Sequence, residues 1–297
     1  MVARMCRWGC QSSCTAALLA LVLGAGCAST RPVPRADAPA QSPLLPSAQT
    51  GLAAPAPPGS AAQPTAEQTN GDTRYPPRCS GPVQLSDRAL RDKLAKVLGM
   101  TGPLTGKRAA EVSELQLMDS GIQNLEGLQC VSALEELGLA NNRVRDLSPL
   151  SGLTQLRKLQ LSRNRVLDVA PLRALTNLES LGLGSNCVGD LQSIASLSKL
   201  QSLDVSFNYV PTIAPLAGMT QLEYVILSGN YFKGGLAPLA GLYELRTLFV
   251  DSTGQTDVGP LTQLVRFDLI VVQRIPLDCD AQAHNIQLLE ANAKLHG

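Results

Sequence analysis

The sequence has few of the side chains that enzymes most often use in catalysis. Only two of its 297 residues are histidine, His284 and His296, and both lie near the C-terminus, where a solvated place on a terminal helix is the simpler interpretation. A G-x-S-x-G nucleophile motif is absent, and no C-x-x-C pair supports a zinc site. We therefore expect a non-enzymatic protein without a cofactor or a bound metal.

An excess of charge of either sign is also lacking. The chain has 25 Lys and Arg against 24 Asp and Glu, and without Arg4 and Arg7 near the N-terminus the balance is 23 against 24. Binding to nucleic acid requires a concentrated basic surface that neutralises phosphates. The composition therefore argues against nucleic acid as a partner.

The apolar run near the N-terminus is too short to cross a bilayer. Residues 15–23 follow Arg4 and Arg7 and precede the small residues GAGCAST. This order is typical of a secretory leader, whereas a transmembrane helix needs about 20 apolar residues. We therefore expect an exported protein.

The small residues before Cys27 resemble a bacterial lipobox, in which the cysteine becomes the lipidated first residue of the mature chain. Gly24 stands where such sequences prefer Leu, and cleavage after Ala28 without lipidation is the alternative. The resemblance implies a signal peptide over residues 1–27 and a lipid anchor in the membrane at Cys27. With Ala28 next to the cysteine, it also implies the bacterial outer membrane or cell surface. Without lipidation the protein would be periplasmic or secreted.

Residues 28–78 are rich in Pro, Ala, Ser and Gln and show no apolar periodicity. Such a segment cannot bury enough surface to offset its chain entropy, so we expect a disordered linker. A flexible chain of about 50 residues spans roughly 40 Å, enough to hold a folded domain away from a membrane. A neutral low-complexity insert is the alternative.

The following sequence repeats one short pattern at a constant step along the chain. The copies LEELGLANN, LRKLQLSRN, LESLGLGSN, LQSLDVSFN and LEYVILSGN start at Leu134, Leu156, Leu178, Leu200 and Leu222. Their final residues keep the same step: Asn142, Asn164, Asn186, Asn208 and Asn230. A period of about 20 to 29 residues with L-x-x-L-x-L-x-x-N is typical of a leucine-rich repeat solenoid, in which each unit buries its apolar side against its neighbours.

Within one unit the apolar positions alternate as in a strand with one buried side. In the unit 134–155, Leu137 and Leu139 are separated by a small residue, and this period of two points one side inward. The Asn that follows can both donate to and accept from backbone groups, so the five asparagines should form a ladder. In the segment DLSPL, we expect Ser148 to cap a short helical turn that begins at Pro149.

This block resembles the leucine-rich repeats of bacterial internalins, whose pattern LxxLxLxxNxIxDLxPLxxLTx is nearly spelled out by LRKLQLSRNRVLDVAPLRALTN at 156–177. The resemblance implies an α/β solenoid: a leucine-rich repeat horseshoe with a parallel concave sheet and short 3₁₀ or helical turns on the convex side. It also implies a helical N-terminal cap at 79–111, repeats over 112–274 and a helical C-terminal cap at 275–297.

The last repeats depart from the pattern. One turn has an extra residue near Lys233, and the turn that starts at Leu245 is interpreted as a short unit, 245–263, with Thr253 in place of the ladder Asn. We expect local distortion there. In the final segment, Ile286 and Leu289 should cover the last repeat, because an exposed solenoid end would be apolar.

Four cysteines remain once the leader and Cys27 are set aside. An exported protein can keep disulfides, and Cys79 beside the N-terminal cap could pair with Cys130 at the end of the first repeat. Cys187 and Cys279 lie several repeats apart in a stack that rises about 4.8 Å per turn, which exceeds the reach of a disulfide. We therefore expect both as buried or free thiols.

Aromatic residues are scarce and unevenly placed. They make up 3% of the chain, and of the nine outside the leader all but Tyr75 lie at Phe207 or beyond. Six residues near the outward strand positions and the ladder form one candidate partner-binding patch: Phe207, Tyr209, Tyr224, Ile226, Tyr231 and Phe249. Exposed aromatic clusters are typical of interface hot spots. A purely structural origin, with Phe207 or Phe232 packed along the solenoid edge, is the alternative.

Taken together, these features predict a non-enzymatic protein-binding scaffold displayed at the bacterial cell envelope. It would act as a monomer and hold a protein partner, or alternatively peptidoglycan or another glycan, on its concave face. An internalin-like host-cell adhesin and an envelope structural protein are the alternatives, since repeats alone do not establish function.

Overall fold

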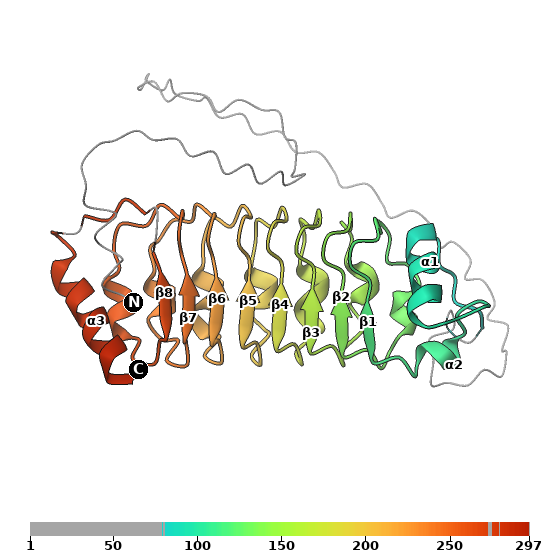
Figure 1. Cartoon of the computed structure of the whole chain (residues 1–297). Helices are drawn as coiled ribbons and strands as arrows, with labels where there is room; N and C mark the ends of the chain where they lie inside the picture. Colours follow the sequence, from blue (N-terminus) through green and yellow to red (C-terminus); the bar gives the residue numbers. More distant parts are fainter. Residues whose placement is uncertain (1–78, 80, 273–274, 279, 297) are drawn as a thin grey trace, which may run out of the picture. The chain divides into compact units, whose positions relative to one another are not determined.

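Short parallel strands, stacked in chain order, form one open sheet. The computed structural model describes residues 79, 81–272, 275–278 and 280–296. Within them, eight strands pair in the order β1 to β8 (Figure 1). Their bounds are Glu114–Gln116 (β1), Glu136–Gly138 (β2), Lys158–Gln160 (β3), Ser180–Gly182 (β4), Ser202–Asp204 (β5), Tyr224–Ile226 (β6), Thr247–Phe249 (β7) and Leu269–Val271 (β8). The predicted leucine-rich repeat solenoid with a parallel sheet is confirmed.

Several predicted features lie outside the described residues. They are the signal peptide at 1–27 with Cys27, the linker at 28–78, and Cys279. Lipidation, cleavage and disorder therefore stay predictions. Among the residues that the structure does describe, no helix has the length and apolar character needed to cross a membrane.

The strands stay in register because the sequence step is nearly constant. Equivalent residues of successive repeats pair with each other, as Leu137 does with Leu159. The pairing of Tyr224 with Thr247 keeps this register although its repeat is one residue longer. The extra residue is taken up in the loop between β6 and β7, where Gly234 and Gly235 have φ of 90° and 73°. Positive φ is accessible to glycine at little cost, so the insertion alters the loop and leaves the sheet intact.

Short 3₁₀ helices lie on the side of the repeats away from the sheet, as predicted. Their bounds are Leu128–Cys130 (η3), Ser148–Leu150 (η4), Ala170–Ala174 (η5), Gln192–Ile194 (η6), Ala214–Gly218 (η7), Ala237–Leu239 (η8) and Gly259–Gln263 (η9).

The prediction that Ser148 caps its turn is wrong. Asp146 takes this role, because its Oδ1 accepts a hydrogen bond from the Ser148 N–H at 2.8 Å. Hydrogen bonds from the Ser148 hydroxyl and N–H lower the pKa of Asp146. Asp168 and Asp190 serve the next two turns in the same way. An Asp carboxylate can accept a hydrogen bond from the backbone N–H two residues later and so starts a tight turn.

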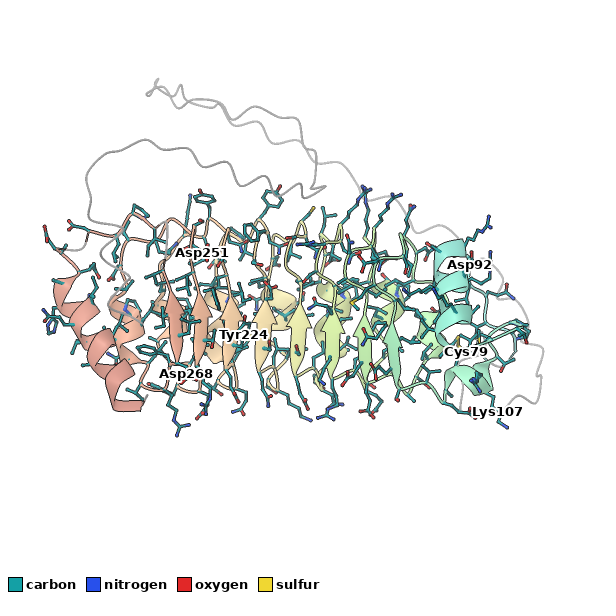
Figure 2. All side chains as sticks on the ribbon, viewed as in Figure 1. Cys79, Asp92, Lys107, Tyr224, Asp251 and Asp268 are labelled. Carbon is teal, nitrogen blue, oxygen red and sulfur yellow. A yellow bond between two sulfur atoms is a disulfide. The ribbon has the colours of Figure 1, made fainter. Side chains whose placement is uncertain are left out.

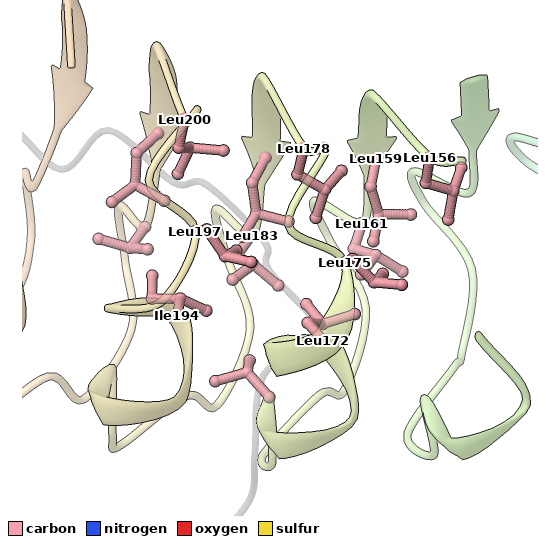
Figure 3. Close-up of a cluster of buried hydrophobic side chains, with 14 of the residues drawn as sticks. Leu156, Leu159, Leu161, Leu172, Leu175, Leu178, Leu183, Ile194, Leu197 and Leu200 are labelled. Carbon is pink, nitrogen blue, oxygen red and sulfur yellow. The ribbon is translucent and has the colours of Figure 1, made fainter. Parts of the chain in front are cut away.

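The core is a column of aliphatic side chains between the sheet and the 3₁₀ helices (Figure 3). In the repeat that starts at Leu156, the buried set is Leu156, Leu159, Leu161, Val166, Val169, Leu172 and Leu175. Burying one such side chain contributes about 1.5–3 kcal/mol. Because each set contacts those of the neighbouring repeats, the stability is shared along the stack.

The turn that starts at Leu245 is a full repeat, which corrects its interpretation as a short unit. β7 pairs with β8 at the ordinary step, Thr247 with Leu269, and Phe267 is buried in the slot that Leu245 fills one repeat earlier. The shorter count mistook Leu264, buried in the slot of Leu242, for the start of a unit. A Phe in a Leu slot hid the register, because the core requires apolar volume there and tolerates a different residue type.

Helices close both ends of the sheet (Figure 1). α1 (Arg88–Val97) and α2 (Gly106–Ala109) lie beside β1. At the other end α3 (Ala283–His296) packs against η9. Leu289 of α3 is buried and Ile286 packs against the core. These contacts cover the apolar ends that a stack of repeats would otherwise expose.

Asp87 joins the N-terminal helix to the first repeat. One carboxylate oxygen caps α1 by accepting from Leu90 N–H at 3.0 Å, and the other accepts from Gln123 N–H at 2.8 Å and Asn124 N–H at 2.9 Å. Burial raises the pKa of this carboxyl, but those N–H groups, together with that of Ala89, outweigh burial and lower the pKa below its ordinary value.

Candidate functional site

The solvent-facing side of the sheet consists of two rows with one residue per strand. The first row runs Glu114, Glu136, Lys158, Ser180, Ser202, Tyr224, Thr247 and Leu269. The second runs Gln116, Gly138, Gln160, Gly182, Asp204, Ile226, Phe249 and Val271. Because the strands pair in register, both rows are polar or small up to β5 and gain large apolar side chains from β6 on.

The N-terminal half of this face is polar, and it contains an ion pair between Lys158 and Glu136. Lys158 Nζ lies 2.6 Å from Glu136 Oε1, and this hydrogen bond raises the pKa of Lys158. Gln160 lies across Gly182 on the next strand, where an added Cβ would come within 1.9 Å of the Gln160 Oε1. The glutamine therefore fills the space that the glycine leaves.

The C-terminal half carries a cluster that we call the face group: Tyr224, Ile226 and Phe249. The rings of Tyr224 and Phe249 lie 6.2 Å apart between centroids, at an angle of 55°. Tyr224 is 38% exposed, and the other two side chains are half-buried. Figure 2 shows Tyr224 on the open face of the sheet, at β6. This arrangement combines apolar area with a tilted ring pair, as in protein interfaces.

Two carboxylates lie next to residues of the face group. Asp204 pairs with Ile226 on the next strand, and Asp251 follows Phe249 by two residues. Asp204 accepts hydrogen bonds from the N–H and the hydroxyl of Ser206 at 2.8 and 2.6 Å. Asp251, just after β7, accepts from the Ser228 hydroxyl. Neither forms an ion pair with any residue that the structure describes. Neither Asp is predicted from the sequence, because a single Asp per repeat forms no motif. The available signal for Asp204 was its position in the second row, whereas Asp251 lies outside both rows.

The other three residues of the predicted patch form a separate loop group: Phe207, Tyr209 and Tyr231. They project from the loops that follow the strands and are 62%, 64% and 80% exposed. Phe207 has φ of 52°, and its ring lies over Gly229, where an added Cβ would come within 2.6 Å. The Tyr231 ring lies against Gly254. The structure therefore divides the predicted patch between two parts of the surface.

The ladder asparagines lie in the loops that follow the strands, one per repeat, and bond to the backbone. Asn186 donates to the carbonyls of Leu161 and Leu183 at 2.9 Å each and accepts from Val166 N–H at 2.9 Å. Asn142, Asn164, Asn208 and Asn230 are buried with equivalent bonds. Thr253, in the next ladder slot, donates to the Val250 carbonyl at 2.7 Å. These residues hold the loops in place and are not available to a partner.

Cys79 and Cys130 are joined by a disulfide whose Cα atoms are 5.4 Å apart, between the N-terminal cap and η3. Cys187 is also disulfide-bonded, so the expectation of a buried or free thiol is wrong for this residue. That expectation rested on the separation of Cys187 and Cys279 along the stack. A rise per repeat limits only pairings along the stack, and it says nothing about cysteines elsewhere in the chain.

Candidates for metal or acid–base chemistry are sparse. His284 is exposed on α3, and no group of three or more His, Cys, Asp or Glu in the described ranges could hold a metal ion.

Comparisons with known proteins agree with this architecture. A family model described as leucine-rich repeats (2 copies) matches residues 132–174. Internalin C2 from Listeria monocytogenes superposes with a TM-score of 0.64 and 28% identity, over 73% of this chain and 96% of that chain. For an internalin of the same organism, inlF, the values are 0.62 and 25%, over 66% of this chain and 59% of that chain. The chain thus spans less than two thirds of inlF.

A leucine-rich repeat protein of Leptospira interrogans, 18% identical, shares the fold with a TM-score of 0.52 over 57% of this chain and 50% of that chain. The comparison with curated proteins found no match. The repeats and the likeness to the Listeria internalins support a bacterial-type leucine-rich repeat protein, with a fold that generally serves in non-enzymatic interaction scaffolds.

Proposed function

We propose that the protein binds a protein partner through the face group and holds it at the bacterial envelope. The fold supplies a rigid sheet on which outward residues vary while inward residues maintain the core. The envelope location is supported by the leader-like residues 1–27 and by the lipobox-like surroundings of Cys27.

One observation carries the proposal: the repeat does not require aromatic residues at the positions of the face group. At the position of Tyr224 other strands have Glu, Lys, Ser, Thr or Leu, and at that of Phe249 they have Gln, Gly, Asp, Ile or Val. An exposed Tyr contributes little to the core that these repeats share. Its large, rigid side chain would instead supply contact area to a partner at low entropic cost.

The two nearby carboxylates favour a partner that presents hydrogen-bond donors or cations. Asp204 and Asp251 accept from serines but lack a cationic partner among the described residues. A Lys or Arg of the partner could contact both a ring and a carboxylate there. Asp204→Asn should therefore weaken binding without changing the apolar contact.

The experiment is capture from native envelope extract by the immobilised full chain, followed by identification and titration of the captured protein. The double variant Tyr224→Ala, Phe249→Ala should weaken its binding at least about thirtyfold, which corresponds to a hot spot of about 2 kcal/mol. Tyr243→Ala is the matched control, because Tyr243 is an exposed aromatic residue outside both groups.

Equal loss in the control and the double variant would contradict a site at the face group. Small losses scattered over the whole face would favour a structural role in the envelope. The variant Tyr209→Ala, Tyr231→Ala separates the two groups, since a partner confined to the sheet should not respond to it.

A further inference from the structure

The loops that follow the strands form a surface of their own. We call it the loop edge and define it as the stretch of each repeat that begins just before the ladder position: 119–123, 141–145, 163–167, 185–189, 207–211, 229–233 and 252–256. Among the described residues, the four most exposed large apolar side chains lie here: Leu167, Phe207, Tyr209 and Tyr231. Tyr243, which is 59% exposed, comes next and lies outside the loop edge.

Four arginines from two neighbouring repeats lie on the loop edge. Its stretches hold five cations and one carboxylate, and four of the stretches are directly followed by an exposed Asp: Asp146, Asp168, Asp190 and Asp257. The cations are Arg143, Arg145, Arg163, Arg165 and Lys233, all exposed. The carboxylate, Asp119, accepts a hydrogen bond from the Asn141 amide.

The cations of the loop edge lack ion-pair partners among the described residues, in contrast to those near the N-terminal ends of the strands. There, Arg157 lies 2.9 Å from Glu179, and Arg246 lies 3.7 Å from Glu223 and 3.9 Å from Asp268. Unpaired cations repel one another and offer a site for an external anion.

The repeat itself explains why these side chains point outward. Arg165 lies between Asn164 and Val166, both buried, so its own side chain must face solvent. Arg163 and Phe207 precede ladder residues in the left-handed region, with φ of 58° and 52°. That conformation costs a bulky residue about 1–2 kcal/mol, and other repeats use Asp, Asn, Ser or Gly there. An exposed Phe gains nothing comparable from the fold.

We propose that the loop edge is a docking surface for an anionic lipid bilayer. Anionic headgroups attract basic residues near the membrane surface, and aromatic side chains favour the interfacial region, where a ring is partly desolvated. From the repeat of Arg143 to that of Tyr231 the edge extends about 20 Å, at about 4.8 Å per repeat. In Figure 2 nitrogen-tipped side chains project beyond β1–β3, and rings project on the same side beyond β5–β7.

A bilayer fits this pattern better than an acidic polypeptide does. The cations and the rings lie in different repeats along a ridge of exposed side chains, so a peptide would have to stay extended over the whole ridge to reach both. A fluid, flat surface with mobile anions can meet both parts at once. Docking on the loop edge would leave the face group open to a partner, and it does not depend on the proposed function.

The test measures binding of the non-acylated full chain to vesicles of phosphatidylcholine with and without phosphatidylglycerol, by flotation. Binding should require phosphatidylglycerol and weaken with salt. Each arginine near the surface contributes about fivefold, so Arg143→Gln with Arg165→Gln should weaken binding about twenty-fivefold. The matched control removes two exposed charges elsewhere, Arg173→Gln with Lys199→Gln.

Substitution of the rings, Phe207→Ser with Tyr231→Ser, should reduce the binding that persists at high salt, whereas Tyr224→Ala should have no effect. Binding that is independent of phosphatidylglycerol, or equal losses in the arginine variant and its control, would overturn the proposal. Equally tight binding to soluble polyglutamate, unaffected by the ring substitutions, would assign the surface to acidic polypeptides and would also overturn it.

Discussion

Replacement of Asn186 by Ala tests whether the ladder stabilises the stack of repeats. The Asn186 side chain is buried and makes three hydrogen bonds, with the carbonyls of Leu161 and Leu183 and with the N–H of Val166. Alanine can replace none of these bonds. The cost depends on which backbone groups keep another partner.

The two carbonyls are partly protected, but the N–H is not. Leu161 and Leu183 also accept from Asn164 and Asn208, at 2.9 Å each. Only the Val166 N–H loses its single partner. An orphaned buried donor costs about 1–3 kcal/mol, and each lost carbonyl bond contributes a net value of about 0.5–1.5 kcal/mol. From these values we expect Asn186→Ala to lower the free energy of unfolding by about 2–6 kcal/mol.

The measurement is urea unfolding followed by far-UV circular dichroism, with the m value compared between variants. Asn177→Ala is the matched control, since Asn177 bonds to the Thr154 carbonyl and to Lys199 at the exposed surface. The control should lose less than about 0.5 kcal/mol. Equal losses at Asn177 and Asn186 would refute the reasoning that burial and the orphaned N–H set the cost.

Three further predictions concern the ends of the solenoid. Replacing Cys79 and Cys130 by Ser opens a disulfide that spans 51 residues and should lower stability by up to about 4 kcal/mol, measured by urea unfolding; unchanged stability would count against this. The pKa of Asp87 is lowered in the folded state, so its contribution is present above the unfolded value of about 4 and is lost as pH falls through the lower folded value. Unfolding series at several pH values should therefore show a shallower acid loss for Asp87→Asn, and parallel curves would contradict this. Phe267→Ala, in a buried leucine slot, should cost about 3–5 kcal/mol in the same assay, and a loss under about 1 kcal/mol would show that the slot is not part of the core.

The fold could be predicted because the repeat constrains it at every copy. A constant step places each inward leucine over the last, so the register and the two rows on the face followed from counting. Counting along the repeat failed at two places, where a residue other than the expected one has the structural role. Phe267 fills the leucine slot that starts a repeat, and counting did not identify it as that start. Asp146, two residues before the turn, caps it in place of Ser148.

The candidate site could be predicted only in part. Enrichment of aromatic residues after Phe207 is visible in the sequence, but whether two side chains share a surface depends on backbone direction. Tyr224 lies on a strand, whereas Phe207 is turned outward by its positive φ. The Cys187 disulfide was missed because the prediction compared Cys187 only with Cys279 along the stack and left out the other cysteines of the chain.

The sequence by itself determined the inward half of the molecule, since apolar side chains at a fixed period can be buried only by stacking equal units. It also determined the ladder, because a buried turn needs an amide to pair its backbone groups. Counting also gives the outward rows of the sheet, and only the tertiary structure separated the loop residues from the face group. It gathered five cations from a nearly neutral chain onto the loop edge and left the face group on the sheet. Outward side chains have no packing constraint of their own, so their neighbours are set by how the repeats are placed beside one another.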